Sequence, residues 1–141
     1  MKTLIFVLSL FLTSTASLAQ TNDELAVRNV LDGQIRDWNN GAIDSFMNSY
    51  WKSDSLLFIG KSGPGYGWQN TLDHYKKSYP DTATMGKLRF ELVEVKRLSV
   101  LYFFVAGKWF LTRSAGNLNG AFTLLFKKIK NKWVIVVDHS S

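Results

Sequence analysis

The residues best suited to proton transfer in this chain are Asp138 and His139, which stand side by side near its end. Carboxylates and imidazoles serve as general acids and bases because burial and neighbouring charges move their pKa values towards neutral pH. The pair lies in a segment expected to be a strand, where neighbouring side chains point to opposite faces. We therefore expect only one of them to reach a pocket as a catalytic residue. In the alternative interpretation, both close a dimer or cap the last strand through hydrogen bonds.

A second set of residues could hold a substrate. Trp68 and Tyr75 follow a glycine-rich segment, and their rings could stack on a flat ligand while the Tyr75 phenol donates a hydrogen bond. They are equally consistent with ordinary core aromatics. Lys108, Phe110 and Thr112 share one phase of a later strand, so they would enter a pocket together.

The sequence contains no motif for binding a metal or a cofactor. The chain has no cysteine and two histidines, which leaves too few ligands for a thiolate or multi-histidine metal site. The glycines between residues 60 and 67 lack the lysine of a phosphate-binding loop and are better explained by a turn. We expect neither a metal nor a cofactor.

The N-terminal half is expected to be helical. Val27, Leu31 and Trp38 lie on one apolar stripe of a helix that begins near residue 22 and ends at 39–41. Further elements expected in this half are a short helix over 43–50, a buried strand over 56–59, a loop or tight hairpin over 60–67 and a helix over 69–79 that stops at Pro80.

From Lys87 onward the hydrophobic period changes to two, which indicates strands. The consecutive Leu92 and Val93 break the alternation as a β-bulge would. Further strands are expected over 100–113, 121–129 and 133–140, joined by turns at 115–120 and 130–132. Helices followed by four consecutive antiparallel strands predict one α+β domain over 20–141, with helices packed on one face of a strongly curved sheet.

Several of these strands are apolar in both phases. On the strand over 100–113, Trp109 and Leu111 take one phase and Phe110 takes the other. Three short helices cover only one face of a sheet, so we expect the second face to pack on a second copy of the chain as a homodimer.

The first nineteen residues have the pattern of a signal peptide. Lys2 precedes an apolar run from Leu4 to Leu12, and Ser17-Leu18-Ala19 offers small residues to a signal peptidase. The run is too short for a membrane anchor. We expect cleavage after residue 19, a periplasmic or secreted protein and no membrane association afterwards; the alternative is a hydrophobic first helix of the fold.

The composition is that of a globular protein, with 46% hydrophobic and 14% aromatic residues and only two prolines. The formal net charge is +6, but the basic residues are scattered along the chain. Scattered charge is typical of a solvated surface, and export argues against nucleic acid as a partner.

A series of short motifs resembles the exported, functionally undefined branch of the nuclear-transport-factor-2-like superfamily. The motifs are Gly67-Trp68, Thr71-Leu72, Tyr75, Ser78-Tyr79-Pro80-Asp81, Met85-Gly86, Leu88-x-Phe90, Gly107-Lys108-Trp109, Gly120-x-Phe122-Thr123-Leu124 and the end from Trp133 to Ser141. The superfamily includes SnoaL-like polyketide cyclases, ketosteroid isomerase, scytalone dehydratase and the association domain of calcium/calmodulin-dependent protein kinase II.

The resemblance implies a cone-shaped fold that encloses a pocket, usually in a dimer. By analogy with the kinase association domain, it also implies that Lys108 and Asp138 face inward. It does not imply one activity, because the fold hosts enzymes, binding proteins and assembly domains.

Three functions are therefore open. We favour an exported binding protein for a small apolar or aromatic molecule. The first alternative is a cofactor-free enzyme that uses Asp138 or His139 as general acid or base beside a carbonyl group. The second is a dimeric assembly domain whose cone is filled by Phe122, Leu124 and Phe126.

Overall fold

The computed structural model describes the backbone of residues 4–141 and the side chains from Asn22 onward. The expected signal peptide, residues 1–19, lies outside the part of the chain with described side chains. Among the described residues, no helix combines the length and the apolar composition needed to cross a membrane.

The domain is built on one six-stranded sheet with the strand order β2-β1-β6-β5-β4-β3. The strands are β1 (Leu57–Gly60), β2 (Gly63–Tyr66), β3 (Lys87–Arg97), β4 (Tyr102–Thr112), β5 (Leu118–Ile129) and β6 (Lys132–Ser140). All neighbours are antiparallel except β1 and β6, which run parallel. The expected α+β class with helices on a curved, mainly antiparallel sheet is confirmed.

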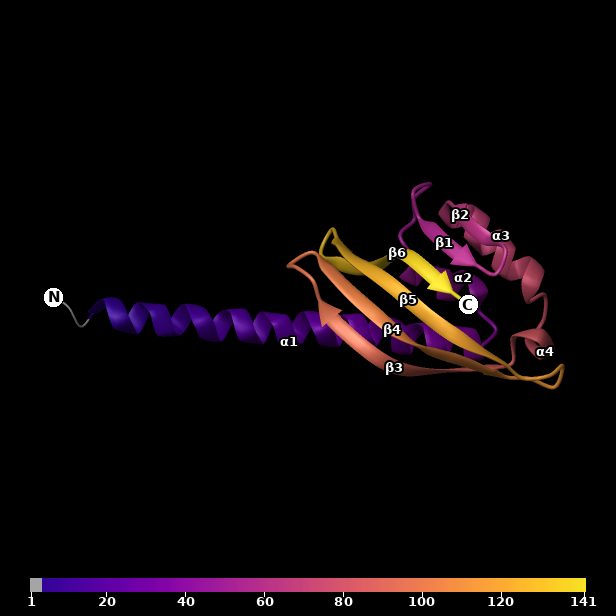
Figure 1. The fold of residues 1–141 in the computed structure, drawn as a ribbon, viewed down its shortest axis with the longest axis horizontal. Helices are drawn as coiled ribbons and strands as arrows, with labels where there is room; N and C mark the ends of the chain where they lie inside the picture. The colour runs from indigo at the N-terminus through magenta and orange to yellow at the C-terminus, as the bar shows by residue number, and fades with distance from the viewer. Residues whose placement is uncertain (1–3) are drawn as a thin grey trace.

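The helices lie against the concave side of this sheet and at one end of it (Figure 1). They are α1 (Leu4–Asn39), α2 (Ile43–Phe46) with the 3-10 turn η1 (Met47–Ser49), α3 (Trp68–Ser78) and α4 (Thr82–Met85). Helix α4 was not expected from the sequence. Its start is fixed by a capping box in which the Asp81 side chain accepts from the Thr84 backbone N–H at 2.8 Å.

The apolar stripe of α1 packs on the sheet as expected, with Val27, Leu31 and Trp38 buried. Gln34 lies on the same stripe and is equally buried, so its amide needs a partner. It donates to the Ser49 hydroxyl at 2.7 Å and thereby joins α1 to η1.

The C-terminal end of α1 is joined to β3 and α4 by side chains. The Asn39 amide exchanges two hydrogen bonds with the backbone of Leu88, at 2.6 and 3.2 Å. The Trp38 indole N–H donates to the Met85 carbonyl at 3.1 Å. These contacts fix the distance between α1 and the edge of the sheet.

Two bulges change the phase of the strands. The expected bulge at Leu92 and Val93 is present, since Leu92 pairs with Gly107 and Glu94 pairs with Ala106. A second bulge, which no sequence pattern indicates, leaves Val136 unpaired between two residues of β6 that pair with neighbours on β5.

The Val136 bulge decides which residues of β6 face the helices. Trp133 and Ile135 are buried before the bulge, and Asp138 is buried after it, although strict alternation would separate Ile135 from Asp138. The inward phase of the strand therefore moves from odd to even residue numbers.

Asp23 attaches the start of the described part of α1 to three strands. Its carboxylate accepts from Lys128 of β5 at 2.9 Å and from the Trp133 indole of β6 at 3.2 Å, and it lies 3.5 Å from the Arg97 guanidinium of β3. Burial alone raises the pKa of Asp23. The hydrogen bonds from Lys128 and Trp133 and the charges of Lys128 and Arg97 outweigh that effect, so the pKa lies below its usual value.

We predict that Asp23→Asn lowers the free energy of unfolding by about 1–2 kcal/mol at neutral pH, because it removes the charged partner of these donors. A lowered pKa contributes stability above the ordinary value of about 4, and that contribution is lost as the pH falls through the folded-state value. The cost of the substitution should therefore shrink in acid. Urea unfolding at several pH values measures both effects.

Glu24→Gln is the matched control, because Glu24 is the adjacent acidic residue and pairs only with Arg28 on the surface. It should change the free energy of unfolding by less than about 0.5 kcal/mol. An equal loss in both variants would show that Asp23 does not join α1 to the strands in the way described.

Candidate functional site

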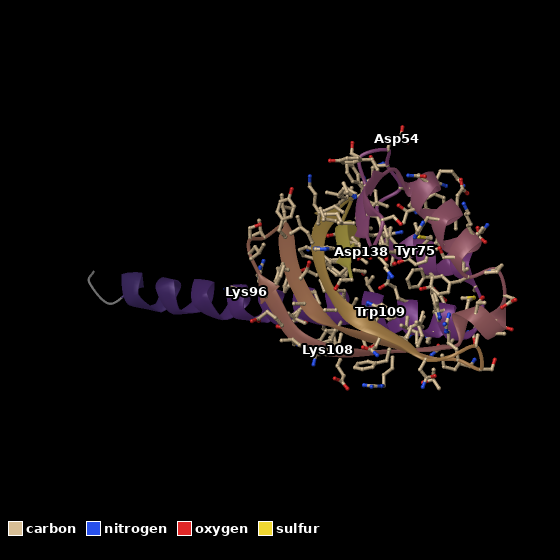
Figure 2. All side chains as sticks on the ribbon, turned by 45° about the vertical axis from the view of Figure 1, so that its right-hand side comes forward. Asp54, Tyr75, Lys96, Lys108, Trp109 and Asp138 are labelled. Carbon is tan, nitrogen blue, oxygen red and sulfur yellow. The ribbon has the colours of Figure 1, made fainter. Side chains whose placement is uncertain are left out.

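A cavity of about 680 Å³ lies between the concave face of the sheet and the helices. Its wall is mainly apolar, with aromatic rings from helices and strands alike. These rings belong to Trp38, Phe46, Tyr50, Phe58, Tyr75, Tyr79, Phe90, Trp109 and Phe122. Figure 2 shows Tyr75, Trp109 and Asp138 around this interior, contributed by α3, β4 and β6.

Asp138 is the buried acid of the cavity wall, with only 3% of its surface exposed. One carboxylate oxygen accepts from the Tyr50 hydroxyl and the other from the Ser140 hydroxyl, each at 2.7 Å. Ser140 faces the same side because it lies two residues further along the strand. Tyr50 reaches the site from the segment after η1, which forms a bridge to Ile135 of β6.

Desolvation raises the pKa of Asp138. The hydrogen bonds from Ser140 and Tyr50 and the charge of His139 lower it, but the net shift of the pKa is upward. Desolvation also raises the pKa of Tyr50 and of Tyr75 well above the usual value, and the nearby Asp138 charge adds to both shifts. Both phenols are therefore neutral donors at physiological pH.

Tyr75 stands at the centre of an aromatic cluster. Its ring makes edge contacts with Phe46, Phe58 and Trp38, at centroid distances of 5.3, 5.6 and 5.9 Å. Its hydroxyl lies 3.4 Å from the Tyr50 hydroxyl, at the outer limit of a hydrogen bond. Tyr75 is thus held firmly by its ring while its hydroxyl is only weakly engaged.

The prediction of which side chains on the strand over 100–113 enter the pocket is wrong. Lys108, Phe110 and Thr112 lie on the convex face, and none of them lines the cavity. The inward side chains of β4 are Trp109 and Leu111 instead. Both phases of this strand are apolar, so hydrophobicity alone did not choose between them.

Contacts on the convex face confirm this orientation. The Arg89 guanidinium lies over the Phe110 ring at 4.1 Å, and Lys108 is paired in register with Glu91. In Figure 2 Lys108 extends from the side of the sheet opposite the cavity. Lys108 therefore does not offset the charge of Asp138.

Trp68 also lies outside the cavity wall, contrary to expectation. Its indole N–H donates to the Met47 carbonyl at 2.9 Å, and the Lys52 ammonium lies 5.0 Å from its ring centre. Trp68 therefore connects the start of α3 to η1. Of the two aromatics expected at the site, Tyr75 alone lines the cavity.

His139 and Asp138 are separated by the alternation of β6, as expected for neighbours on a strand. The His139 side chain is exposed and borders the cavity at the end of β6, whereas Asp138 is buried. Phe122, Leu124 and Phe126 do face inward and are buried, but the cavity persists beside them.

Sequence reasoning missed Tyr50 and Ser140 as partners of Asp138. Tyr50 is 88 positions away in sequence from the acid that it contacts, and it lies at the end of the short helix expected over 43–50. Only the spacing of Asp138 and Ser140 on one strand carried a usable signal.

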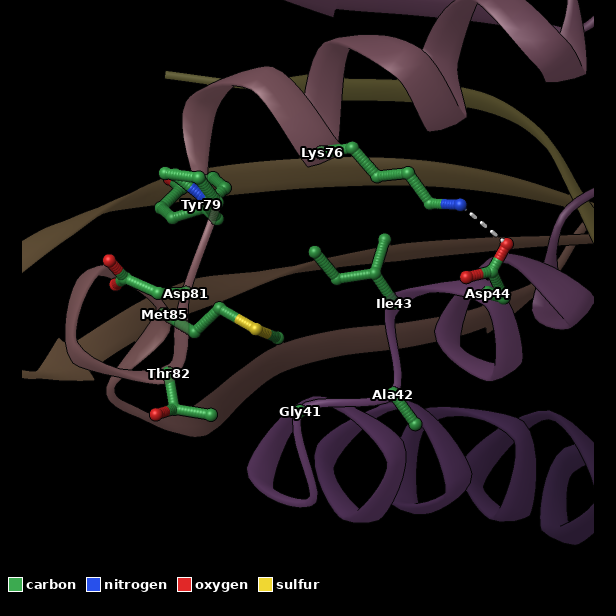
Figure 3. A pocket seen from close by; sticks show the side chains of 10 residues that line it. Gly41, Ala42, Ile43, Asp44, Lys76, Tyr79, Asp81, Thr82 and Met85 are labelled. Carbon is green, nitrogen blue, oxygen red and sulfur yellow. Dashed lines mark hydrogen bonds and ion pairs between the residues drawn. The ribbon is translucent and has the colours of Figure 1, made fainter.

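A second hollow, of about 470 Å³, lies on the surface between the α1–α2 connection and the ends of α3 and α4 (Figure 3). Its polar groups, Asp44, Lys76 and Asp81, are exposed, and Lys76 pairs with Asp44 at 2.9 Å. It lacks the buried polar centre of the larger cavity. Across the residues with described side chains, no three His, Asp or Glu residues are grouped as metal ligands.

The raised pKa of Asp138 gives a prediction for stability. A carboxyl group with a raised folded-state pKa stabilises the fold below its ordinary value of about 4, and this contribution is lost as the pH rises through the folded-state value. Asp138→Asn cannot ionise. We therefore predict that the wild-type protein loses free energy of unfolding relative to Asp138→Asn as the pH rises from about 4.

Urea unfolding of both proteins across this range measures the change. Asp54→Asn, which alters an exposed aspartate on a turn, accounts for the general effect of removing one negative charge. A wild-type protein that instead gained stability relative to Asp138→Asn with rising pH would contradict the assigned environment of Asp138.

No protein-family model matches the sequence, and no curated protein matches it. Solved structures do match this chain. A nuclear-transport-factor-2-like protein of unknown function from Shewanella oneidensis is 40% identical with a TM-score of 0.80, and the match covers 86% of this chain and 98% of that one.

Two more distant structures share the fold. A ketosteroid isomerase-like protein from Erwinia carotovora is 16% identical with a TM-score of 0.64, over 83% of this chain and 93% of that one. A putative association domain of calcium/calmodulin-dependent protein kinase II from Thiobacillus denitrificans is 16% identical with a TM-score of 0.69, over 79% of this chain and 90% of that one. The similarity to the Shewanella protein agrees with the fold and with the sequence motifs. This chain therefore belongs to the nuclear-transport-factor-2-like family.

Proposed function

We propose that this protein is an exported binding protein that holds a small, largely apolar molecule in the cavity between its sheet and helices. The observation that carries the proposal is the aromatic-lined cavity of about 680 Å³ with one buried acid in its wall. Its volume is within the range of small-molecule sites, which are mostly apolar with a few polar groups that orient the ligand. An assembly domain would need no such interior space.

Rigid aromatic walls suit this role. Trp38 contacts Phe46 and Tyr79 edge-on at 5.2 and 4.9 Å, so the rings support one another and need little ordering when a ligand enters. A flat apolar body would gain contact with several rings at once.

An enzyme of the ketosteroid isomerase type is the second candidate, and the environment of Asp138 favours it. A carboxylate with a raised pKa, oriented by Tyr50 and Ser140, could remove a proton beside a carbonyl group. The Tyr75 hydroxyl would be the available donor for the resulting oxyanion. The enzyme would turn over an added ketone, and the binding protein would release its ligand unchanged.

We also propose that two copies associate through the convex face of the sheet. Phe104, Leu125, Val137 and Leu57 are paired in register across four adjacent strands and form an apolar row on that face. Each remains partly exposed in one copy of the chain. A second copy placed on this row would cover it.

The binding proposal is tested by native mass spectrometry of protein recovered from the periplasm of an exporting host. We expect a retained small molecule and a protein mass that corresponds to a chain beginning near Gln20. Leu118→Trp, which adds bulk at the cavity wall, should retain several-fold less ligand because it fills the site. Leu101→Trp is the control, because Leu101 is similarly exposed but lies outside the cavity wall.

A protein that carries no ligand and binds none of a broad set of apolar compounds would contradict the binding proposal. A mass that includes the first nineteen residues in a soluble periplasmic fraction would contradict the proposed cleavage. The two results are independent of each other.

The dimer is tested by sedimentation at micromolar concentration. We expect Leu125→Glu to convert the dimer to a species of about 14 kDa, because it places a charge at the centre of an interface that should bury more than about 1,200 Å². Thr112→Glu, at the end of β4 on the same face and outside the apolar row, should remain dimeric. A wild-type protein that sediments only as a monomer would refute the proposed association.

A further inference from the structure

The buried acid of the cavity has no cationic partner. The ion pairs formed by described side chains involve Asp23, Glu24, Asp44 and Glu91 as acids, but not Asp138. Buried carboxylates are ordinarily paired because an isolated charge is costly to remove from water. Among the side chains that the structure describes, those that hydrogen-bond to Asp138 carry two neutral hydroxyl groups.

We propose that the ligand of this cavity is an amine whose protonated nitrogen binds Asp138 and whose flat apolar body lies among the aromatic rings. This inference rests on the proposed binding function and specifies the chemical class of the ligand. The charge, the hydrogen-bonding capacity and the surroundings of Asp138 each support it.

The basic residues of the described cavity wall lie at its exposed margin. Lys61 is the one lysine or arginine in the described wall, and it lies exposed in the turn between β1 and β2. His74 and His139 also belong to the wall, and both are exposed. The buried part of the described wall therefore holds one acid and no lysine or arginine, and the charge that acts on Asp138 is that of the exposed neighbour His139.

The carboxylate has unused capacity for hydrogen bonds. Its two oxygens offer about four acceptor directions, and Tyr50 and Ser140 occupy one on each oxygen. An ammonium group has three N–H donors and no acceptor, so it could fill a remaining direction. The oxygen of the Tyr75 hydroxyl, 3.4 Å from that of Tyr50, offers a further acceptor on the same side.

The rings near the acid favour a cation in the same place. Tyr75 lies next to Tyr50, stacks on Tyr79 at 6.3 Å and contacts Phe58 at 5.6 Å. Aromatic faces attract cations through their quadrupoles, most strongly in sites that exclude water. An acid beside several aromatic rings therefore combines two attractions that act on an ammonium and not on a neutral group.

The same features reject anions. A carboxylate or phosphate on the ligand would meet Asp138 without a buried lysine or arginine beside it, since Lys108 faces the opposite side of the sheet and Lys61 lies exposed at the margin. A neutral alcohol could donate to Asp138 but would leave its charge unpaired. The expected order of affinity for a common apolar body is amine, then alcohol, then carboxylate.

The test is calorimetric titration of the wild-type protein with three matched sets of probes. Phenethylamine, tryptamine and naphthylethylamine are each compared with the alcohol and the carboxylate that share the same body. At about pH 8 the amines remain protonated. We expect at least one amine to bind about tenfold or more tightly than its alcohol, which is the scale of a hydrogen bond to a charged group, and its carboxylate to bind more weakly still.

Asp138→Asn should reduce the affinity for that amine at least about tenfold and change the affinity for the alcohol by less than about threefold. Asp54→Asn removes an exposed aspartate far from the cavity wall and should leave both affinities unchanged. The ratio measured on the wild-type protein decides the proposal even if Asp138→Asn does not fold.

If alcohols or carboxylates bind as tightly as amines for every body, the amine proposal is wrong and the binding function stands. The amine proposal is likewise wrong, and the binding function stands, if only neutral or anionic probes bind. If none of the nine compounds binds and the exported protein carries no ligand, both proposals fail. An amine preference that survives Asp138→Asn would also overturn the assignment of Asp138 as its partner.

Discussion

The buried acid of the cavity depends on one extra residue in β6. Trp133 and Ile135 must face the helices because they complete the apolar core, and strict alternation would then direct Asp138 to the convex face. The bulge at Val136 adds one residue between the two and returns Asp138 to the inside. Without it, the interior would have no buried acid and the proposed chemistry would have no centre.

The same strand also places the donor that the acid requires. The backbone N–H of Trp51 donates to the Ile135 carbonyl at 2.9 Å, which holds the adjacent Tyr50 beside β6. Trp68 holds η1 from the other side through the Met47 carbonyl. Trp68 thus acts as a positioning residue, because it supports the segment that delivers the Tyr50 hydroxyl. A buried carboxylate in an aromatic cavity is tolerable only with such donors fixed in place.

The sequence predicted the elements well and the orientation of the site less well. The bulge at Val93 was visible because it interrupts an alternation of polar and apolar residues. The bulge at Val136 was hidden, since residues 134–137 are all apolar and accept either phase. Lys108 was placed inward by analogy with the kinase association domain, and the local sequence could not correct this because the adjacent Trp109 and Phe110 are both large and apolar. The contact between Tyr50 and Asp138 depends on tertiary structure that no local pattern encodes.

Gly107 makes room for the Phe122 ring in the cavity wall. A Cβ atom on Gly107 would lie 2.7 Å from the Phe122 ring and 2.6 Å from the Glu91 carbonyl oxygen, so a side chain at this position would displace one of them. Phe90 packs on its other side at 5.1 Å. Gly107 is also opposite Leu92, next to the Val93 bulge, where the sheet bends. The bulge and the glycine act together: the bulge curves the sheet around the interior, and the glycine accommodates the Phe122 ring against β4.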